Sequence, residues 1–202
     1  CSFTENLADG VSVTDGGLGT YEGNTIMRNK DDGVSVDGEG SAPIVNNNMI
    51  AKNNGNGVIL FDGATGTVTN CYVNSNKESG IEVDACFTRV SLNRIRSNGK
   101  AGLQATDDSK CELHDNQLMD NNLEEDPEGN SQVNVDEEAE DEDDVAVYFR
   151  DNRDKFNQPL AVDAGCRYMP HGCILPQGCK ATDGGTRPRV ITANLTATAN
   201  IA

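Results

Sequence analysis

A six-residue motif returns along the first part of this chain at a nearly constant interval. It reads Asn-x-apolar-x-x-Asn, and its closing asparagines are Asn6, Asn29, Asn53, Asn76, Asn98 and Asn121, separated by 22 to 24 residues. In two copies a cysteine, Cys1 or Cys71, replaces the first asparagine. A fixed period of this length is typical of solenoids, in which each repeat buries its apolar side only against its neighbours.

Each repeat contains two further stretches with alternating apolar residues. One reads Gly-apolar-x-apolar and begins at Gly10, Gly33, Gly57, Gly80 and Gly102; the other precedes the Asn motif around Ile44, Val68, Val90 and Leu113. Alternation with period two, interrupted by turns rich in Asn, Gly and Asp, predicts three short strands per repeat. The predicted fold class is all-β, a parallel β-helix of about 23 residues per coil over residues 1–122.

Stacked coils place equivalent residues in ladders along the axis. The middle residues of the motif are expected to form an inward apolar stack: Ile26, Ile50, Val73, Ile95 and Leu118. The asparagines are expected at corners, because asparagine tolerates left-handed backbone and its amide can bond along a ladder. The repeated glycines are expected to adopt positive φ where the chain turns into the next strand.

The motif Asn24-Thr-Ile26-Met-Arg-Asn29, followed by Gly33-Val-Ser-Val36, resembles the "carbohydrate-binding and sugar hydrolysis" repeats of the pectate-lyase-like superfamily. This resemblance covers residues 1–122 and implies a right-handed β-helix. Members include polysaccharide lyases, epimerases, copper-maturation proteins and substrate-binding parts of ubiquitin ligases. The resemblance therefore implies a fold far more specifically than an activity.

The remainder of the chain divides into three segments. Residues 123–144 hold 12 of the 33 acidic residues and no Lys or Arg; without them the net charge of -17 would be -5. They are predicted to be an acidic, disordered loop, either simply solvated or a docking or cation-binding segment. Residues 145–165 are expected to complete the last coil, with 145–149 as its delayed Gly-block strand. Residues 166–202 are a non-repeat tail, either a cap over the open end or a segment reaching a partner.

Composition excludes some functions and favours a compartment. An acidic surface repels phosphate backbones, so nucleic acid is not expected as a partner. No apolar run is long enough to span a bilayer. The chain starts partway through a repeat, without Met, and is expected to be a processed or incomplete form of something longer. The sequon at Asn194 and three late cysteines, Cys166, Cys173 and Cys179, favour a lumenal or secreted setting over a cytoplasmic one.

One acidic series invites a catalytic or metal-binding interpretation. Asp37, Asp62, Asp84 and Asp107 follow the Gly-block strands of successive coils, and Asp15 takes a similar place in the first. Stacking would align their carboxylates in a column that could bind Ca²⁺ or supply the paired acids of a glycoside hydrolase. The alternative is turn formation, because aspartate is a favoured turn residue and each of these ends a strand.

Cations form one cluster in the repeats. Arg89, Arg94, Arg96 and Lys100 could hold an anionic ligand or could simply keep the coil soluble. If the chain is an enzyme, the expected site is Asp62, Asp84 and Asp107 with Arg94 and Arg96. Trp is absent and few tyrosines occur, which argues against the aromatic platform of a sugar cleft. His114 with Asp115 forms no recognisable triad, and without a Cys-x-x-Cys pair a zinc site is weakly supported.

Three functional hypotheses follow. The first is a non-catalytic scaffold or binding subunit of a larger protein assembly, for which deletion of residues 123–144 is expected to leave folding intact and weaken partner binding. The second is a carbohydrate-active enzyme (polysaccharide lyase, epimerase or hydrolase), with Ca²⁺ as the one cofactor to consider. The third is glycan binding without turnover.

Overall fold

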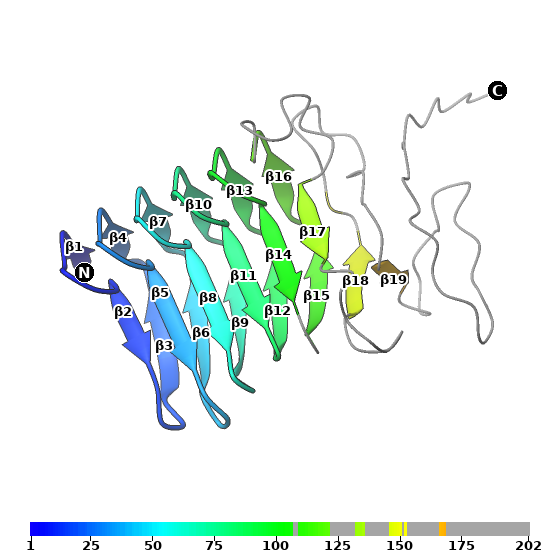
Figure 1. Ribbon diagram of the computed structural model, residues 1–202, viewed down its shortest axis with the longest axis horizontal. Helices are drawn as coiled ribbons and strands as arrows, with labels where there is room; N and C mark the ends of the chain where they lie inside the picture. Colours follow the sequence, from blue (N-terminus) through cyan, green and yellow to red (C-terminus); the bar gives the residue numbers. More distant parts are fainter. Residues whose placement is uncertain (107–108, 122–131, 136–145, 151, 153–165, 169–202) are drawn as a thin grey trace.

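The computed structural model describes residues 1–106, 109–121, 132–135, 146–150, 152 and 166–168. Within these ranges every regular element is a strand, and all strand pairs are parallel. Figure 1 shows the coils stacked side by side along one long axis, so that the strands form three sheets. The parallel β-helix predicted from the repeat is confirmed, with about 23 residues from one coil to the next.

Each coil contributes one strand to each sheet. Sheet A comprises β1 (Ser2–Thr4), β4 (Thr25–Met27), β7 (Met49–Ala51), β10 (Tyr72–Asn74), β13 (Arg94–Arg96) and β16 (Gln117–Met119). Sheet B comprises β2 (Val11–Val13), β5 (Val34–Asp37), β8 (Val58–Phe61), β11 (Ile81–Asp84), β14 (Leu103–Thr106) and β17 (Val133–Val135). Sheet C comprises β3 (Leu18–Glu22), β6 (Ala42–Asn46), β9 (Thr65–Thr69), β12 (Phe87–Ser91), β15 (Lys110–His114), β18 (Ala146–Arg150) and β19 (Cys166–Tyr168).

The core is a set of apolar ladders. The predicted stack Ile26, Ile50, Val73, Ile95 and Leu118 is in register on sheet A, and each member is fully buried. Alternation sends every second side chain inward, so one face of each strand packs on the axis. In sheet C the inward member of the second coil is Val45, which pairs with Val68, while Ile44 is 46% exposed.

The corners use left-handed backbone, but at different residues from those expected. The residue before each motif asparagine, not the asparagine itself, has positive φ. These residues are Glu5, Arg28, Lys52, Ser75, Ser97 and Asp120 after sheet A, and Gly23, Asn47, Asn70, Leu92 and Asp115 after sheet C. The left-handed residue turns the chain so that the next side chain points inward, and this is where the motif asparagine lies.

The motif asparagines form two hydrogen-bonded ladders, as their spacing predicted. In the first, the Asn76 Oδ1 accepts from both the backbone N–H and the side-chain amide of Asn53, at 3.0 Å each, and the Asn76 amide donates to Asn98. This ladder runs from Asn6 to Asn121 and ends on Gln132. Burial of these amides is tolerated because each finds a partner in the next coil.

The repeated glycines have a different role from the one predicted. Gly10, Gly33, Gly57, Gly80 and Gly102 do not have positive φ. At Gly57 an added Cβ would lie 2.4 Å from Val73 Cγ1 and 2.5 Å from the carbonyl oxygen of Gly80. Close approach of neighbouring coils, not unusual dihedral angles, therefore requires glycine at this position.

The end of the regular stack corrects one strand assignment. The sheet B strand after β14 is β17, which lies inside the acidic segment, and β18 belongs to sheet C because it pairs with β15. Val133 is fully buried, and Gln132 closes an asparagine ladder. Deletion of residues 123–144 would also remove this strand, so a deletion that tests the acidic segment alone has to keep residues 132–135. The other residues of the acidic segment, and residues 169–202, lie outside the described ranges.

The second ladder contains a weak link at Cys71. It runs through Asn24, Asn48, Cys71, Asn93 and Asn116 to Asn152. The thiol accepts from the Asn48 backbone and side-chain amides at 3.5 and 4.0 Å, whereas Asn116 Oδ1 accepts from Asn93 at 2.9 and 3.1 Å.

Replacing Cys71 by asparagine is expected to stabilise the protein. A side-chain amide there can accept from Asn48 and donate to the Val45 carbonyl, which the thiol now contacts at 3.5 Å. Exchanging weak sulfur contacts for amide hydrogen bonds should raise the free energy of unfolding by about 1 kcal/mol. Chemical denaturation of Cys71→Asn beside Cys71→Ser checks this; a Cys71→Asn protein less stable than the serine variant would contradict it.

Candidate functional site

The outward side of sheet B carries a row of mostly polar side chains. Ser12, Ser35, Ile59, Glu82 and Gln104 follow one another in register, one per coil, and we call this row the sheet B face. They point outward because the residues on either side of each, such as Ile81 and Val83, are buried in the core. Ser35 is itself buried, whereas the other four members of the row are exposed or partly exposed.

Acidic and amide side chains line the edge where the sheet B strands begin. Asp9 Oδ1 accepts from the Asp32 backbone N–H at 3.0 Å, Asp32 Oδ1 accepts from the Asn56 backbone N–H at 2.5 Å, and Asn56 Oδ1 accepts from the Ser79 backbone N–H at 2.9 Å. Ser79 Oγ in turn donates to Gln104 Oε1 at 3.1 Å. These bonds form a third ladder and hold the carboxylates beside the sheet B face.

Two half-buried carboxyl groups of this region have raised pKa values. Burial raises the pKa of Asp32 to about 6, and the negative charges of Asp31, Asp9 and Glu82 raise it further. The hydrogen bond from the Asn56 backbone acts in the opposite direction and lowers this pKa. Burial also raises the pKa of Glu82, and the negative charge of Asp84 adds to the increase. The positive charge of the nearby Lys100 lowers this pKa but does not cancel the increase. Both groups therefore hold a proton at higher pH than ordinary carboxylates do.

The pKa of Asp32 predicts a pH-dependent stability. The folded pKa lies above the unfolded one, so the charged form disfavours folding, and stability should rise as pH falls from about 7.5 to 4. A two-unit shift corresponds to about 3 kcal/mol, and solvent screening of this partly exposed group reduces it to about 1–2 kcal/mol. Denaturation of Asp32→Asn across this range should show a flatter profile and higher stability at pH 7.5. An unchanged profile would show that Asp32 is not the responsible group.

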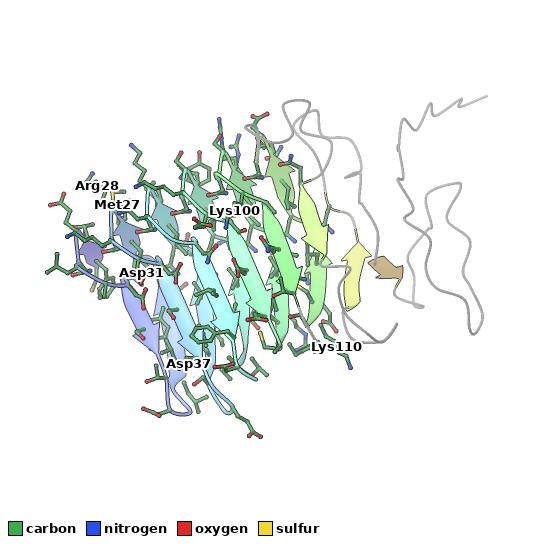
Figure 2. The ribbon with its side chains drawn as sticks, in the orientation of Figure 1. Met27, Arg28, Asp31, Asp37, Lys100 and Lys110 are labelled. Carbon is green, nitrogen blue, oxygen red and sulfur yellow. The ribbon has the colours of Figure 1, made fainter. Side chains whose placement is uncertain are left out.

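Three carboxylates come together at this edge. The side-chain oxygens of Asp9, Asp31 and Asp32 all lie within 4.8 Å of one another. Figure 2 shows Asp31 and Asp37 towards opposite ends of β5. Exposed acidic groups commonly gather at a turn without an ion, and no other feature of the described residues points to a metal here. The oxygen ligands suit Ca²⁺ in kind, but their gathering alone does not assign a site.

The aspartate series proposed from the sequence falls at two different positions. Asp37 and Asp84 close their sheet B strands, where Asp37 pairs with Phe61 and Asp84 with Thr106. Asp62 lies one residue beyond its strand and has positive φ, as does Asp15. Asp107 lies outside the described residues. Two of the five thus occupy a left-handed corner, which fits the turn interpretation of these two positions.

The cationic cluster is divided among three parts of the coil. Arg94 and Arg96 lie together on β13 of sheet A, whereas Arg89 lies on β12 of sheet C, where it pairs with Glu112 at 2.7 Å. Lys100 lies in the turn between sheets A and B and pairs with Glu78. The enzyme site expected from the sequence, which combined Arg94 and Arg96 with aspartates that follow sheet B strands, is therefore not brought together on one sheet.

Cysteine and histidine add no metal centre to the described region. Cys71, Cys86 and Cys111 are buried and unpaired, and burial raises the pKa of each thiol, to about 11 for Cys86. Thiols of this kind stay protonated and are poor nucleophiles or ligands. His114 Nδ1 lies 3.1 Å from Asp115 Oδ2 at a corner. The side chains of Cys166, Cys173 and Cys179 lie outside what the structure describes.

Sequence reasoning missed Asp32 and Glu82 as site residues. Asp32 immediately precedes the Gly block, and Glu82 is the outward residue between two buried ones. The position of each within the repeat could therefore have been predicted from the sequence. What the sequence could not supply is the approach of carboxylates from different coils. Among the described residues there is no helix of the length and apolar character that crossing a membrane requires.

Comparisons with known proteins agree with this architecture. Residues 1–139 match the family described as the right handed beta helix region. The crystal structure of a double mutant of the periplasmic alginate epimerase AlgG superimposes with a TM-score of 0.63 at 18% identity, covering 83% of this chain. The chain spans 43% of the length of that epimerase. A comparison with curated protein sequences gave no match. The chain belongs to the right-handed β-helix family.

Proposed function

We propose that the protein is a carbohydrate-active β-helix that binds a glycan along the sheet B face. The observation that carries this proposal is the row of outward polar side chains beside two half-buried carboxyl groups, Asp32 and Glu82, with raised pKa values. The shared fold with a periplasmic alginate epimerase supports a polysaccharide as the ligand, although alginate is carboxylated and the charge of the sheet B face favours a neutral one.

The geometry of stacked coils suits a linear sugar polymer. Neighbouring coils are about 4.8 Å apart, which is close to the length of one sugar unit in an extended glycan. A glycan lying along the axis would meet an equivalent set of side chains at each unit. Carboxylates accept from sugar hydroxyls, while the Gln104 amide and the exposed Ser12 hydroxyl both donate and accept. Ile59 and the half-buried Phe61 add apolar surface for the faces of sugar rings.

The charge of this face selects among glycans. Asp31, Asp32, Glu82 and Asp84 lie along or beside it, and the nearby Lys100 is already paired with Glu78. Such a surface repels carboxylated or sulfated polymers and admits neutral ones. We therefore expect a neutral glycan to bind more tightly than an anionic glycan of the same length.

Glu82 is the best placed group for proton transfer. It is half-buried on the outward side of β11, at the centre of the sheet B face, and burial raises its pKa, which favours the protonated form that a general acid needs. If the bound glycan is turned over, Glu82 is the general acid or base.

A glycan array with neutral and anionic oligosaccharides tests the binding. We expect binding to neutral members, and a blank array would refute the proposal. For any glycan that is also turned over, Glu82→Gln should keep binding within a few-fold and reduce turnover by about 100-fold. Glu39→Gln, at an exposed turn, is the matched control. Equal turnover by wild type and Glu82→Gln would remove the acid–base role and leave the binding role.

The scaffold role expected from the sequence stays a prediction, because most of the acidic segment lies outside the described residues. The surface that favours contact with another protein lies on sheet A.

A further inference from the structure

Sheet A differs from the rest of the molecule in charge. Its six strands contain no aspartate or glutamate, and their only charged residues are Arg94 and Arg96, both on β13. The chain as a whole has a net charge of -17. A positive surface on so acidic a chain attracts a negative partner that other surfaces repel.

The two arginines project from the same side of the strand. They flank Ile95, which is fully buried, so both guanidinium groups point outward. Alternate residues of a strand are about 7 Å apart. The Arg94 guanidinium lies 5.9 Å from the centroid of the Tyr72 ring in the preceding coil, a cation–π contact that orients it.

Neither arginine forms an ion pair with a residue that the structure describes. The ion pairs found there join Arg28 to Glu5, Arg89 to Glu112 and Lys100 to Glu78. The register neighbours of the two arginines are uncharged: Tyr72, Asn74, Gln117 and Met119. Figure 2 shows Met27 and Arg28 beside each other at the end of β4, in the first coils of the solenoid.

Apolar side chains adjoin the arginines. Leu92, at the left-handed corner two residues before Arg94, is 59% exposed, and Met49, the register neighbour of Tyr72, is 44% exposed. Arginine, tyrosine and methionine are the residues enriched at protein–protein interfaces.

We propose that this arginine face, made of Met49, Tyr72, Leu92, Arg94 and Arg96, binds an extended acidic segment of a partner protein. Carboxylates at alternate positions of an extended peptide have the spacing of Arg94 and Arg96, and each can accept a bidentate pair of hydrogen bonds from a guanidinium group. An apolar residue two positions earlier would cover Leu92. A polysaccharide would satisfy the arginines but would leave Leu92 and Met49 in water, which favours a peptide.

A short fluorescein-labelled peptide tests this, with one leucine followed at alternate positions by two glutamates. Fluorescence anisotropy should show saturable binding that weakens as salt rises. Arg94→Gln with Arg96→Gln should weaken binding by about tenfold or more, and glutamine at both acidic peptide positions should do the same. Arg89→Gln, on sheet C, is the matched control and should bind as the wild type does.

The outcomes separate this proposal from the glycan proposal, which concerns a different sheet. Absence of peptide binding, or equal binding by the double variant with an unchanged far-UV circular dichroism spectrum, would overturn it. Binding of polygalacturonate in place of the peptide, with the same dependence on Arg94 and Arg96, would also overturn it by making this a glycan surface. An array that shows no binding to neutral glycans would refute the glycan proposal and would have no bearing on the peptide result.

Discussion

Replacing Asn76 by alanine is expected to remove about 3–5 kcal/mol from the free energy of unfolding. Asn76 is 2% exposed, and its Oδ1 is the acceptor for two donors of Asn53, the backbone N–H and the side-chain amide. Its own amide donates to the Ile50 carbonyl and to Asn98. Truncation would leave several buried groups without partners, and each costs about 1–3 kcal/mol.

A matched control separates the ladder from the asparagine itself. Asn54, next to the ladder residue Asn53, is exposed, and we expect Asn54→Ala to stay within about 0.5 kcal/mol of the wild type. Urea denaturation followed by circular dichroism measures both variants. A cost below about 1 kcal/mol for Asn76→Ala would show that the ladder contributes little to stability.

Replacing Gly57 by alanine is expected to cost about 2–3 kcal/mol. The new methyl group would lie 2.4 Å from Val73 Cγ1 and 2.5 Å from the backbone oxygen of Gly80, closer than atoms can approach. The backbone oxygen can retreat only if two coils move apart, and overpacking of this kind typically costs about 1–3 kcal/mol.

The comparison with Gly23 tests why glycine is needed. Gly23 has φ of 66°, and a Cβ added there would have no atom within 4 Å. Alanine at this position should therefore cost only the energy of holding a non-glycine residue in the left-handed conformation, about 1 kcal/mol. Thermal unfolding of both variants should therefore rank Gly57→Ala as the more destabilised. The reverse order would mean that backbone conformation, and not contact between coils, governs these positions.

The repeat made most of the solenoid predictable. Residues with period-two alternation, such as Ile26 and Val34, lie in the core because every second side chain of a strand points to the inner face. The asparagine ladders followed from the same spacing. Both features are properties of one coil repeated, and a single sequence displays them directly.

The features that were predicted wrongly or not predicted at all depend mostly on atoms in neighbouring coils. The glycine requirement at position 57 comes from Val73 and from the carbonyl of Gly80 in the next coil. Burial is the main cause of the raised pKa of Asp32, and the charges of Asp9 and Glu82 from other coils add to it. Strand β17 was missed because Val133–Val135 stands between acidic runs, and composition suggested a loop. Burial of Val133 against the last coil outweighed that local composition.

The most direct test of the proposed function is a titration of the isotopically labelled protein with the neutral oligosaccharide that binds most strongly on the array, followed by NMR chemical shifts. Glycan binding along the sheet B face predicts saturable shift changes at Ile59, Glu82 and Gln104, which lie on successive coils. Changes confined to sheet A around Arg94 and Arg96, or no changes at all, would contradict it.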